Sequence, residues 1–153
     1  MFMKKLSLYV FLVFMWCTIS YSDEGLKNIY YFDLVVEKVK DNKCGVTNEN
    51  IEREVKYVLA NSPIKLKKDI SIEAIYISPT IINNGSYCSG FANFEIWLGG
   101  DNKNSAGVKY FGKEVSYNKG YIFTSSINRF KNGYLEVIND LTKSFIVAWK
   151  EVN

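Results

Sequence analysis

The stretch SYCSGFANFEIWLGG, Ser86 to Gly100, alternates in the manner of a β-strand that separates two environments. The residues on one side of this predicted strand are glycine or apolar: Gly90, Ala92, Phe94, Ile96 and Leu98. The other side mixes aromatic, amide and acidic groups: Phe91, Asn93, Glu95 and Trp97. Because successive side chains of a strand point to opposite faces, the pattern predicts a sheet whose two faces differ in chemistry.

The segments around this strand predict further strands. Asp69 to Ser78 alternates Ile70, Ile72, Ala74 and Tyr76 with a mixed face, and the turn residues Asn83 to Ser86 make it a hairpin partner. Val108 to Ser126 holds two β-prone runs around Asn118-Lys119-Gly120, which predicts a second hairpin. Ile29 to Lys38 is aromatic and β-branched, which predicts a central strand largely buried on both faces.

Two segments have the apolar period of helices. Thr47 can cap a helix that buries Ile51, Val55, Val58 and Leu59 and ends near Pro63. Asn132 to Val152 carries a second apolar stripe: Tyr134, Ile138, Leu141, Phe145, either Ala148 or Trp149, and Val152. The resulting order β-α-β-β-β-β-α predicts a two-layer α+β fold, with an antiparallel sheet of four or five strands and both helices on one face.

The first 22 residues have the features of an export signal. Lys4 and Lys5 precede an apolar run to Cys17, and small residues before Asp23 favour cleavage after Ser22. The expectation is a single domain at 23–153, periplasmic or secreted. An uncleaved anchor and a lipoprotein attached through Cys17 are the alternatives, although the run is short for a membrane span.

Cysteine and histidine content limits the chemistry. Cys44 and Cys88 remain after export, and two cysteines in an oxidising compartment predict one disulfide. The chain has no histidine, which excludes the Ser-His-Asp, Cys-His and HExxH arrangements. Two cysteines without histidine make a poor zinc site, so neither a metal nor a cofactor is expected.

Charge and loop composition argue against polyanions and nucleotides. The net charge is +3, and removal of Lys4 and Lys5 leaves about +1, too little to attract nucleic acid or an anionic membrane. GVKYFGKE, Gly107 to Glu114, has the glycine and lysine spacing of a phosphate loop. Its intervening residues form strands and Glu114 would repel phosphate, so we expect an extended segment with a bulge at Gly112.

Three functions fit what remains. The first is a non-enzymatic binding module for another envelope or secreted protein, anchored by aromatic residues on the uncovered sheet face: Tyr30, Tyr87, Trp97, Tyr110 and Tyr117. The second is a carbohydrate-acting enzyme that uses Glu95 with Asp101 or Glu114. The third is a structural subunit of an envelope assembly that pairs through a sheet edge.

A resemblance rests on three motifs: Lys43-Cys44-Gly45 before the first helix, GSYCSG at 85–90, and the terminal LTKSFIVAWKEVN at 141–153. Together they resemble a loose group of small exported bacterial proteins, which are single α+β domains after a signal peptide and have no established activity. The resemblance implies export and the α+β fold, and it assigns no site residue.

Overall fold

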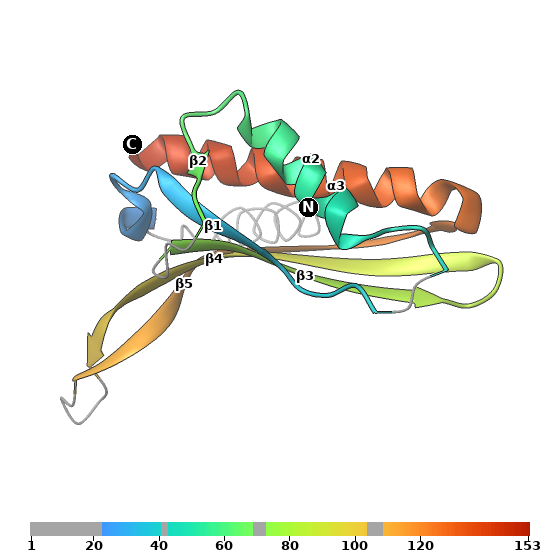
Figure 1. The fold of residues 1–153 in the computed structure, drawn as a ribbon, viewed down its shortest axis with the longest axis horizontal. Coiled ribbons are helices and arrows are strands. Elements are labelled where there is room, and N and C mark those ends of the chain that lie inside the picture. Colours follow the sequence, from blue (N-terminus) through green and yellow to red (C-terminus); the bar gives the residue numbers. More distant parts are fainter. Residues whose placement is uncertain (1–22, 41–42, 69–72, 104–108) are drawn as a thin grey trace, which may run out of the picture.

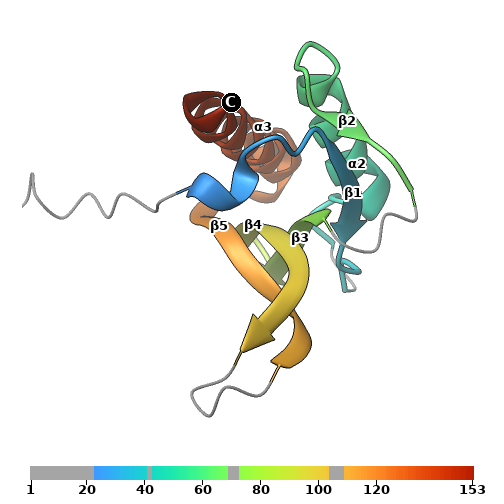
Figure 2. The ribbon, with the colours of Figure 1, turned by 90° about the vertical axis from the view of Figure 1, so that its left-hand side faces the viewer.

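The protein forms two layers in a computed structural model that describes residues 23–40, 43–68, 73–103 and 109–153. Helices α2 (Asn48–Leu59) and α3 (Ile127–Val152) lie on one face of a five-stranded sheet (Figures 1 and 2). A short 3-10 helix, η1 (Asp23–Leu26), precedes the predicted order β-α-β-β-β-β-α. The fold is therefore the expected two-layer α+β fold, while the predicted signal at 1–22 lies outside the described residues.

The sheet is mixed and not wholly antiparallel. Its strands are β1 (Tyr31–Val36), β2 (Lys65–Leu66), β3 (Glu73–Asn83), β4 (Tyr87–Lys103) and β5 (Lys109–Ser126), in the spatial order β2-β1-β3-β4-β5. β1 runs parallel to β2 and to β3, whereas β3, β4 and β5 are antiparallel in turn. The prediction of an antiparallel sheet is wrong at β1 because the chain crosses over through α2 and re-enters the sheet in the same direction.

One predicted hairpin does not exist. Asn118 pairs with Glu95 and Gly120 with Asn93, so β5 passes straight through the expected turn. β4 offers a continuous partner on this side, and its hydrogen bonds outweigh the local turn preference. The strand count still agrees because the short β2, which the sequence did not predict, takes the missing place.

The segment with phosphate-loop spacing is extended, as predicted. Residues 109–115 belong to β5 and pair with β4, while 107–108 lie outside the described residues. The bulge expected at Gly112 is elsewhere: Gly112 pairs regularly with Gly100, and the irregularity falls between Ile96 and Trp97, opposite Ser116. A strand-to-helix phosphate loop is therefore absent from this part of the described chain.

The helix-facing side of the sheet forms the core. Ile75, Ile77, Phe94 and Ile96 are fully buried against α2 and α3, whose buried residues follow the predicted stripes. β1 contributes Phe32, but Val35 on its other side is 39% exposed. The expectation that β1 is buried on both faces is thus wrong, because no helix in the described part of the chain covers the second face.

Two features fix the sheet beneath the helices. Cys44 and Cys88 form the predicted disulfide, which ties the entrance of α2 to the start of β4. Gly90 allows Tyr134 of α3 to approach β4, since a Cβ there would lie 2.6 Å from the Tyr134 ring. The Tyr134 hydroxyl then donates to the Phe91 carbonyl at 3.0 Å. Burial raises the pKa of Tyr134 far above its usual value. The hydroxyl therefore stays protonated and can act as a hydrogen-bond donor.

Candidate functional site

The second sheet face, which we call the open face, is the candidate site. Strand register places on it Val35 of β1, Tyr76, Ser78 and Ile82 of β3, Tyr87, Phe91, Asn93, Glu95 and Trp97 of β4, and Val115, Asn118 and Ile122 of β5. Glu37, directly after β1, joins this face through its hydrogen bonds to Tyr76 and Ser78. Both helices lie on the opposite side (Figure 2). Beyond the helices the β4–β5 hairpin projects away from the body of the protein (Figure 1).

An aromatic pair lies at the centre of the open face. The rings of Tyr76 and Trp97 stack with centroids 4.0 Å apart and planes 14° apart. They come from adjacent strands, where Tyr76 is opposite Glu95 and Trp97 is two residues further along. Cross-strand diagonal neighbours are within reach of large aromatic rings, which explains the stack. The pair forms a flat, half-buried ridge.

Glu95 accepts hydrogen bonds on both of its carboxylate oxygens. The Trp97 indole N–H donates to Oε2 at 2.5 Å, and the Asn93 side-chain amide donates to Oε1 at 2.6 Å. The Asn118 amide lies 3.4 Å from the same Oε1. Hydrogen bonds to both oxygens fix the orientation of a carboxylate. Glu95 is therefore a positioned anion beside the stack.

Glu37 is a second positioned anion, on the other side of the stack. Ser78 Oγ donates to its Oε2 at 2.6 Å, and the Tyr76 hydroxyl donates to its Oε1. These two bonds, Ser78 first, hold the pKa of Glu37 below its usual range, with a smaller contribution from Lys40. The hydrogen bond from Tyr76 to Glu37 raises the pKa of Tyr76 to about 12. Tyr76 thus remains a donor at any physiological pH.

The backbone around Glu37 is held by the first residue of α2. The Asn48 side-chain amide donates to the carbonyls of Val36 at 3.1 Å and Glu37 at 2.9 Å, and its oxygen accepts from the Val39 amide at 2.9 Å. Thr47 caps the helix by accepting from the Asn50 amide. One helix terminus therefore fixes the end of β1, from which Glu37 reaches the open face.

Exposed apolar side chains flank the polar centre. Ile82, Tyr87, Phe91 and Ile122 lie toward one end, and Ile82 and Ile122 are 62% and 74% exposed. Val115 lies toward the other end and is also exposed. Single exposed apolar residues are ordinary, but several on adjacent strands of one face are typical of an interaction surface.

Two carboxylates lie at the centre of the open face. Among the side chains that the structure describes there, hydrogen bonds fix the charged groups Glu37 and Glu95. Lys40, beyond the end of β1, contributes to the lowered pKa of Glu37. The described centre of this face is therefore acidic.

The aromatic residues predicted to bind a partner are not all together. Trp97 and Tyr87 lie on the open face. Tyr117 lies on the helix-facing side, where its ring packs 5.7 Å from Phe145 and 6.2 Å from Phe94. Tyr30 precedes β1 and packs on Trp149. Tyr110 pairs with Asn102 through its backbone, and its side chain is outside the described part.

The carboxylate pair of a glycosidase is not formed by the predicted residues. Glu114 pairs with Leu98, whose side of β4 is opposite that of Glu95, so the two carboxylates point to different faces. Asp101 lies six residues along β4 from Glu95, about 20 Å in a strand. Glycosidases need separations of about 5 to 10 Å. This geometry contradicts both predicted pairs.

Sequence reasoning missed Glu37 and Tyr76 as members of the site. Tyr76 belongs to the alternation that was recognised in β3, but its neighbour Trp97 follows only from the β3–β4 register. Glu37 enters through the parallel pairing of β1 with β3, which the sequence did not predict. The available signal was the hairpin turn at Asn83–Ser86, since the position of a turn sets the register of its strands.

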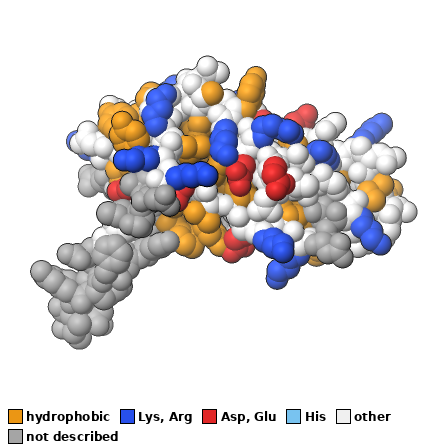
Figure 3. Space-filling model, viewed as in Figure 1, with side chains coloured by type: hydrophobic (Ala, Val, Ile, Leu, Met, Phe, Trp, Pro, Cys, Tyr) orange, Lys and Arg blue, Asp and Glu red, His pale blue; other side chains and the backbone are white. Residues whose placement is uncertain are grey.

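A hollow separate from the open face lies between α2, β1 and β2. Its volume is about 450 Å³, and its lining includes Asp33, Glu52, Lys56 and Lys67. Lys56 is already paired with Glu52 at 2.9 Å. Figure 3 shows basic and acidic side chains interspersed over this side of the protein. The mixed charges give this hollow no single preference for an anion or a cation.

Two further observations concern metals and membranes. Across the described ranges, no three Cys, Asp or Glu side chains gather as a metal site would require. No helix within the same ranges is long and apolar enough to cross a membrane. Comparison with known proteins gives no match, either to a protein-family model or to a curated protein.

Proposed function

We propose that the protein is a non-enzymatic, exported binding module that docks another envelope or secreted protein on its open face. The observation that carries this proposal is the pair of positioned carboxylates, Glu37 and Glu95, on either side of the Tyr76–Trp97 stack. The disulfide is compatible with an oxidising compartment. The resemblance to small exported bacterial proteins supports the same location.

The chemistry of the face indicates what the partner presents. Carboxylates held by N–H and O–H donors keep free lone pairs that can accept from a cation. The face of an aromatic ring beside them favours a guanidinium or ammonium group through cation–π attraction. The partner surface therefore offers an arginine or lysine at its centre, surrounded by apolar side chains that cover Ile82, Tyr87 and Phe91.

Glu37 and Glu95 are both bound to donors of the protein itself. The carbohydrate-acting alternative requires two neighbouring carboxylates, and Glu95 is not close to Asp101 or Glu114. The face is thus better suited to recognition than to catalysis.

The test uses a photo-reactive amino acid in the protein expressed in its source cells. We expect position Ile82 on the open face to cross-link one discrete protein, and position Tyr57 on α2, which is 70% exposed, to give none. Glu95→Gln combined with Glu37→Gln should remove the adduct. Glu114→Gln is the matched control, since it makes the same change on the opposite side of the sheet.

Capture alone does not suffice. The cross-linked peptide of the partner should contain an arginine or lysine, and its reversal to glutamate should abolish binding between the two purified proteins. Equal cross-linking from Ile82 and Tyr57, or an adduct that survives loss of both carboxylates, would refute the proposal.

A further inference from the structure

The two edges of the sheet differ in the way they meet solvent. β2 is two residues long and lies in a segment that contains Lys65, Lys67 and Lys68. Short strands and lysines are the usual means of preventing edge-to-edge association. β5, at the other edge, is 18 residues long. From Val115 to Ser126 its one charged residue is Lys119, whose Nζ donates to Ser144 Oγ at 3.1 Å.

The outer edge of β5 carries unpaired backbone groups at regular intervals. The Ile127 amide donates to the Ser86 carbonyl at 3.2 Å, which sets the phase of the β4–β5 ladder. Antiparallel pairs alternate between bonded and non-bonded, so residues 119, 121, 123 and 125 bond to β4. The amides and carbonyls of Asn118, Gly120, Ile122 and Thr124 then point outward. No hydrogen bond between described residues satisfies them.

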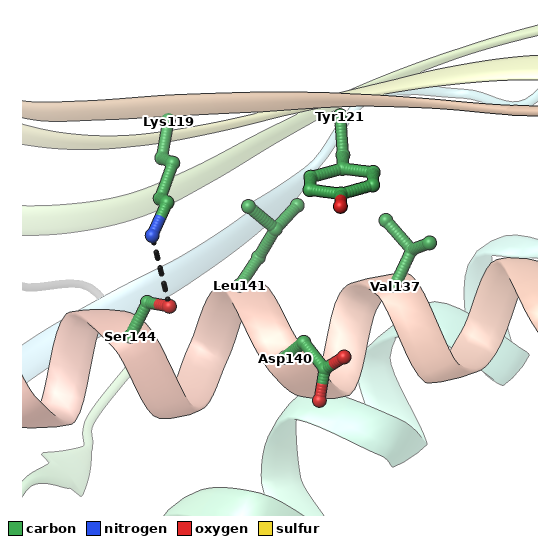
Figure 4. A pocket seen from close by; sticks show the side chains of 6 residues that line it. All are labelled: Lys119, Tyr121, Val137, Asp140, Leu141 and Ser144. Atoms are coloured by element: carbon green, nitrogen blue, oxygen red, sulfur yellow. Dashed lines mark hydrogen bonds between the residues drawn. The ribbon is translucent and has the colours of Figure 1, made fainter. Parts of the chain in front are cut away.

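A pocket lies beside the same edge, between β5 and α3. Its volume is about 120 Å³, and it is lined by Lys119 and Tyr121 of β5 and by Val137, Asp140, Leu141 and Ser144 of α3. Lys119 and Tyr121 point from the strand toward the helix, and Leu141 and Val137 point back (Figure 4). Tyr121 is 58% exposed although it is on the helix-facing side. The pocket is thus open at the sheet edge.

We propose that β5 is a strand-addition site, filled by β5 of a second copy of this chain in antiparallel orientation. Strand addition combines backbone bonds along an edge with a pocket for an alternate side chain, and both features occur here. The β5 segment is itself β-prone and almost uncharged, which is the chemistry that the site requires. A two-fold axis through the pair removes the exposed long edge from both copies.

Pairing centred on Gly120 is compatible with the pocket. This pairing sets Tyr121 of each copy opposite Lys119 of the other, on the helix-facing side. There the Tyr121 ring of one copy can enter the pocket of the other copy beside Leu141. On the open face it sets Ile122 opposite Asn118 of the second copy, which reduces the exposure of Ile122. The result is one continuous sheet made from two five-stranded halves.

Sedimentation velocity of the exported protein, from low micromolar to millimolar concentration, tests the proposal. We expect a reversible monomer–dimer equilibrium. Ile122→Lys should abolish the dimer by placing a charge on the edge. Ile122→Pro should do the same without unfolding, because the lost N–H points away from β4. Val147→Lys is the matched control on α3 and should dimerise like the unaltered chain.

Amide hydrogen exchange locates the interface. In the dimer, the amides of Gly120, Ile122 and Thr124 should be protected, and in Ile122→Lys the remaining outward amides should exchange fast while Tyr121 and Phe123 stay slow. A protein that is monomeric throughout, or a dimer that Ile122→Lys leaves intact, would overturn the proposal. Outward amides that become protected only when an envelope extract is added would also overturn it, because the added strand would then belong to another protein.

The proposal does not depend on the open-face partner. Glu37→Gln with Glu95→Gln should leave the dimer unchanged, since neither carboxylate lies on β5. The two hypotheses can therefore fail separately.

Discussion

Tyr76 and Trp97 stack at 4.0 Å on adjacent antiparallel strands, and each also bonds to a different carboxylate. The stack therefore joins Glu37 and Glu95 into one surface. Each link crosses between strands or spans two residues of one strand, so the arrangement depends on the register of β1, β3 and β4. Changes at these residues provide a direct measure of that arrangement.

The first prediction concerns the energy of the stack. A double-mutant cycle of Tyr76→Leu and Trp97→Leu should give a coupling free energy of about 1 kcal/mol, the usual value for an aromatic pair. Urea denaturation of the four proteins measures it. A second cycle that pairs Tyr76 with Tyr87, eight residues from Glu95 along β4, should give no coupling. Equal coupling in both cycles would contradict direct contact.

The second prediction concerns protonation at Glu37. Its pKa is lowered in the folded protein, so its bonds to Ser78 and Tyr76 stabilise the fold above the ordinary glutamate range, and this stabilisation is lost as the pH falls through the lowered pKa. Carbon-13 NMR of the carboxyl group should show the low pKa, and Ser78→Ala should raise it. An ordinary pKa in the unaltered protein would contradict the hydrogen bonds.

The third prediction concerns Tyr76, the donor of the hydrogen bond to Glu37. Glu37→Gln should lower the pKa of Tyr76 from about 12 toward the usual value, because its anionic acceptor is removed. The signal of Tyr76, assigned by its absence in Tyr76→Phe, can be followed by NMR at alkaline pH. Glu114→Gln should leave this titration unchanged. A shift of similar size in both variants would indicate a general charge effect.

The fourth prediction reverses an expectation from helix propensity. Replacing a glycine inside a helix by alanine ordinarily stabilises it by about 1 kcal/mol. At Gly133 of α3, however, the new Cβ would lie 2.2 Å from the ring of Phe123 on β5. Overpacking of this kind costs about 1 to 3 kcal/mol, so Gly133→Ala should destabilise the protein.

Two controls test that cause by the free energy of unfolding. Asn132→Ala changes the exposed neighbour and should be neutral or slightly stabilising. Phe123→Leu, combined with Gly133→Ala, should recover part of the loss because it shortens the obstructing side chain. If Gly133→Ala alone stabilises the protein, β5 and α3 are further apart than described.

The fifth prediction concerns the disulfide. Cys44 and Cys88 are 44 residues apart, and a cross-link of that span is worth about 4 kcal/mol in the chain-entropy account. Cys44→Ala with Cys88→Ala should lose stability of that order in urea denaturation, and a reductant should lower the unaltered protein to the same level. Alkylation of both cysteines in the native, unreduced protein would contradict the bond.

The sequence by itself determined the elements that depend on local pattern. Thr47 and the stripe Ile51, Val55 and Leu59 predicted α2, the apolar period predicted α3, and the two faces of β4 were readable from alternation alone. The disulfide was predicted from the two cysteines that lie outside the expected export signal, Cys44 and Cys88. These features depend on neighbours within a few residues, or on a count, and no knowledge of the tertiary structure is needed for them.

Only the tertiary structure decided the pairing between distant segments. The β3–β4 register placed Tyr76 on Trp97, the parallel entry of β1 brought Glu37 to Tyr76, and the long partner strand β4 kept β5 straight through Asn118-Lys119-Gly120. The β4–β5 register likewise places Tyr117 and Glu114 on the helix-facing side, away from the candidate site. A strand's alternation defines two faces but not which face is covered or which residue lies opposite, because hydrogen bonds to another strand and burial under a helix make that choice.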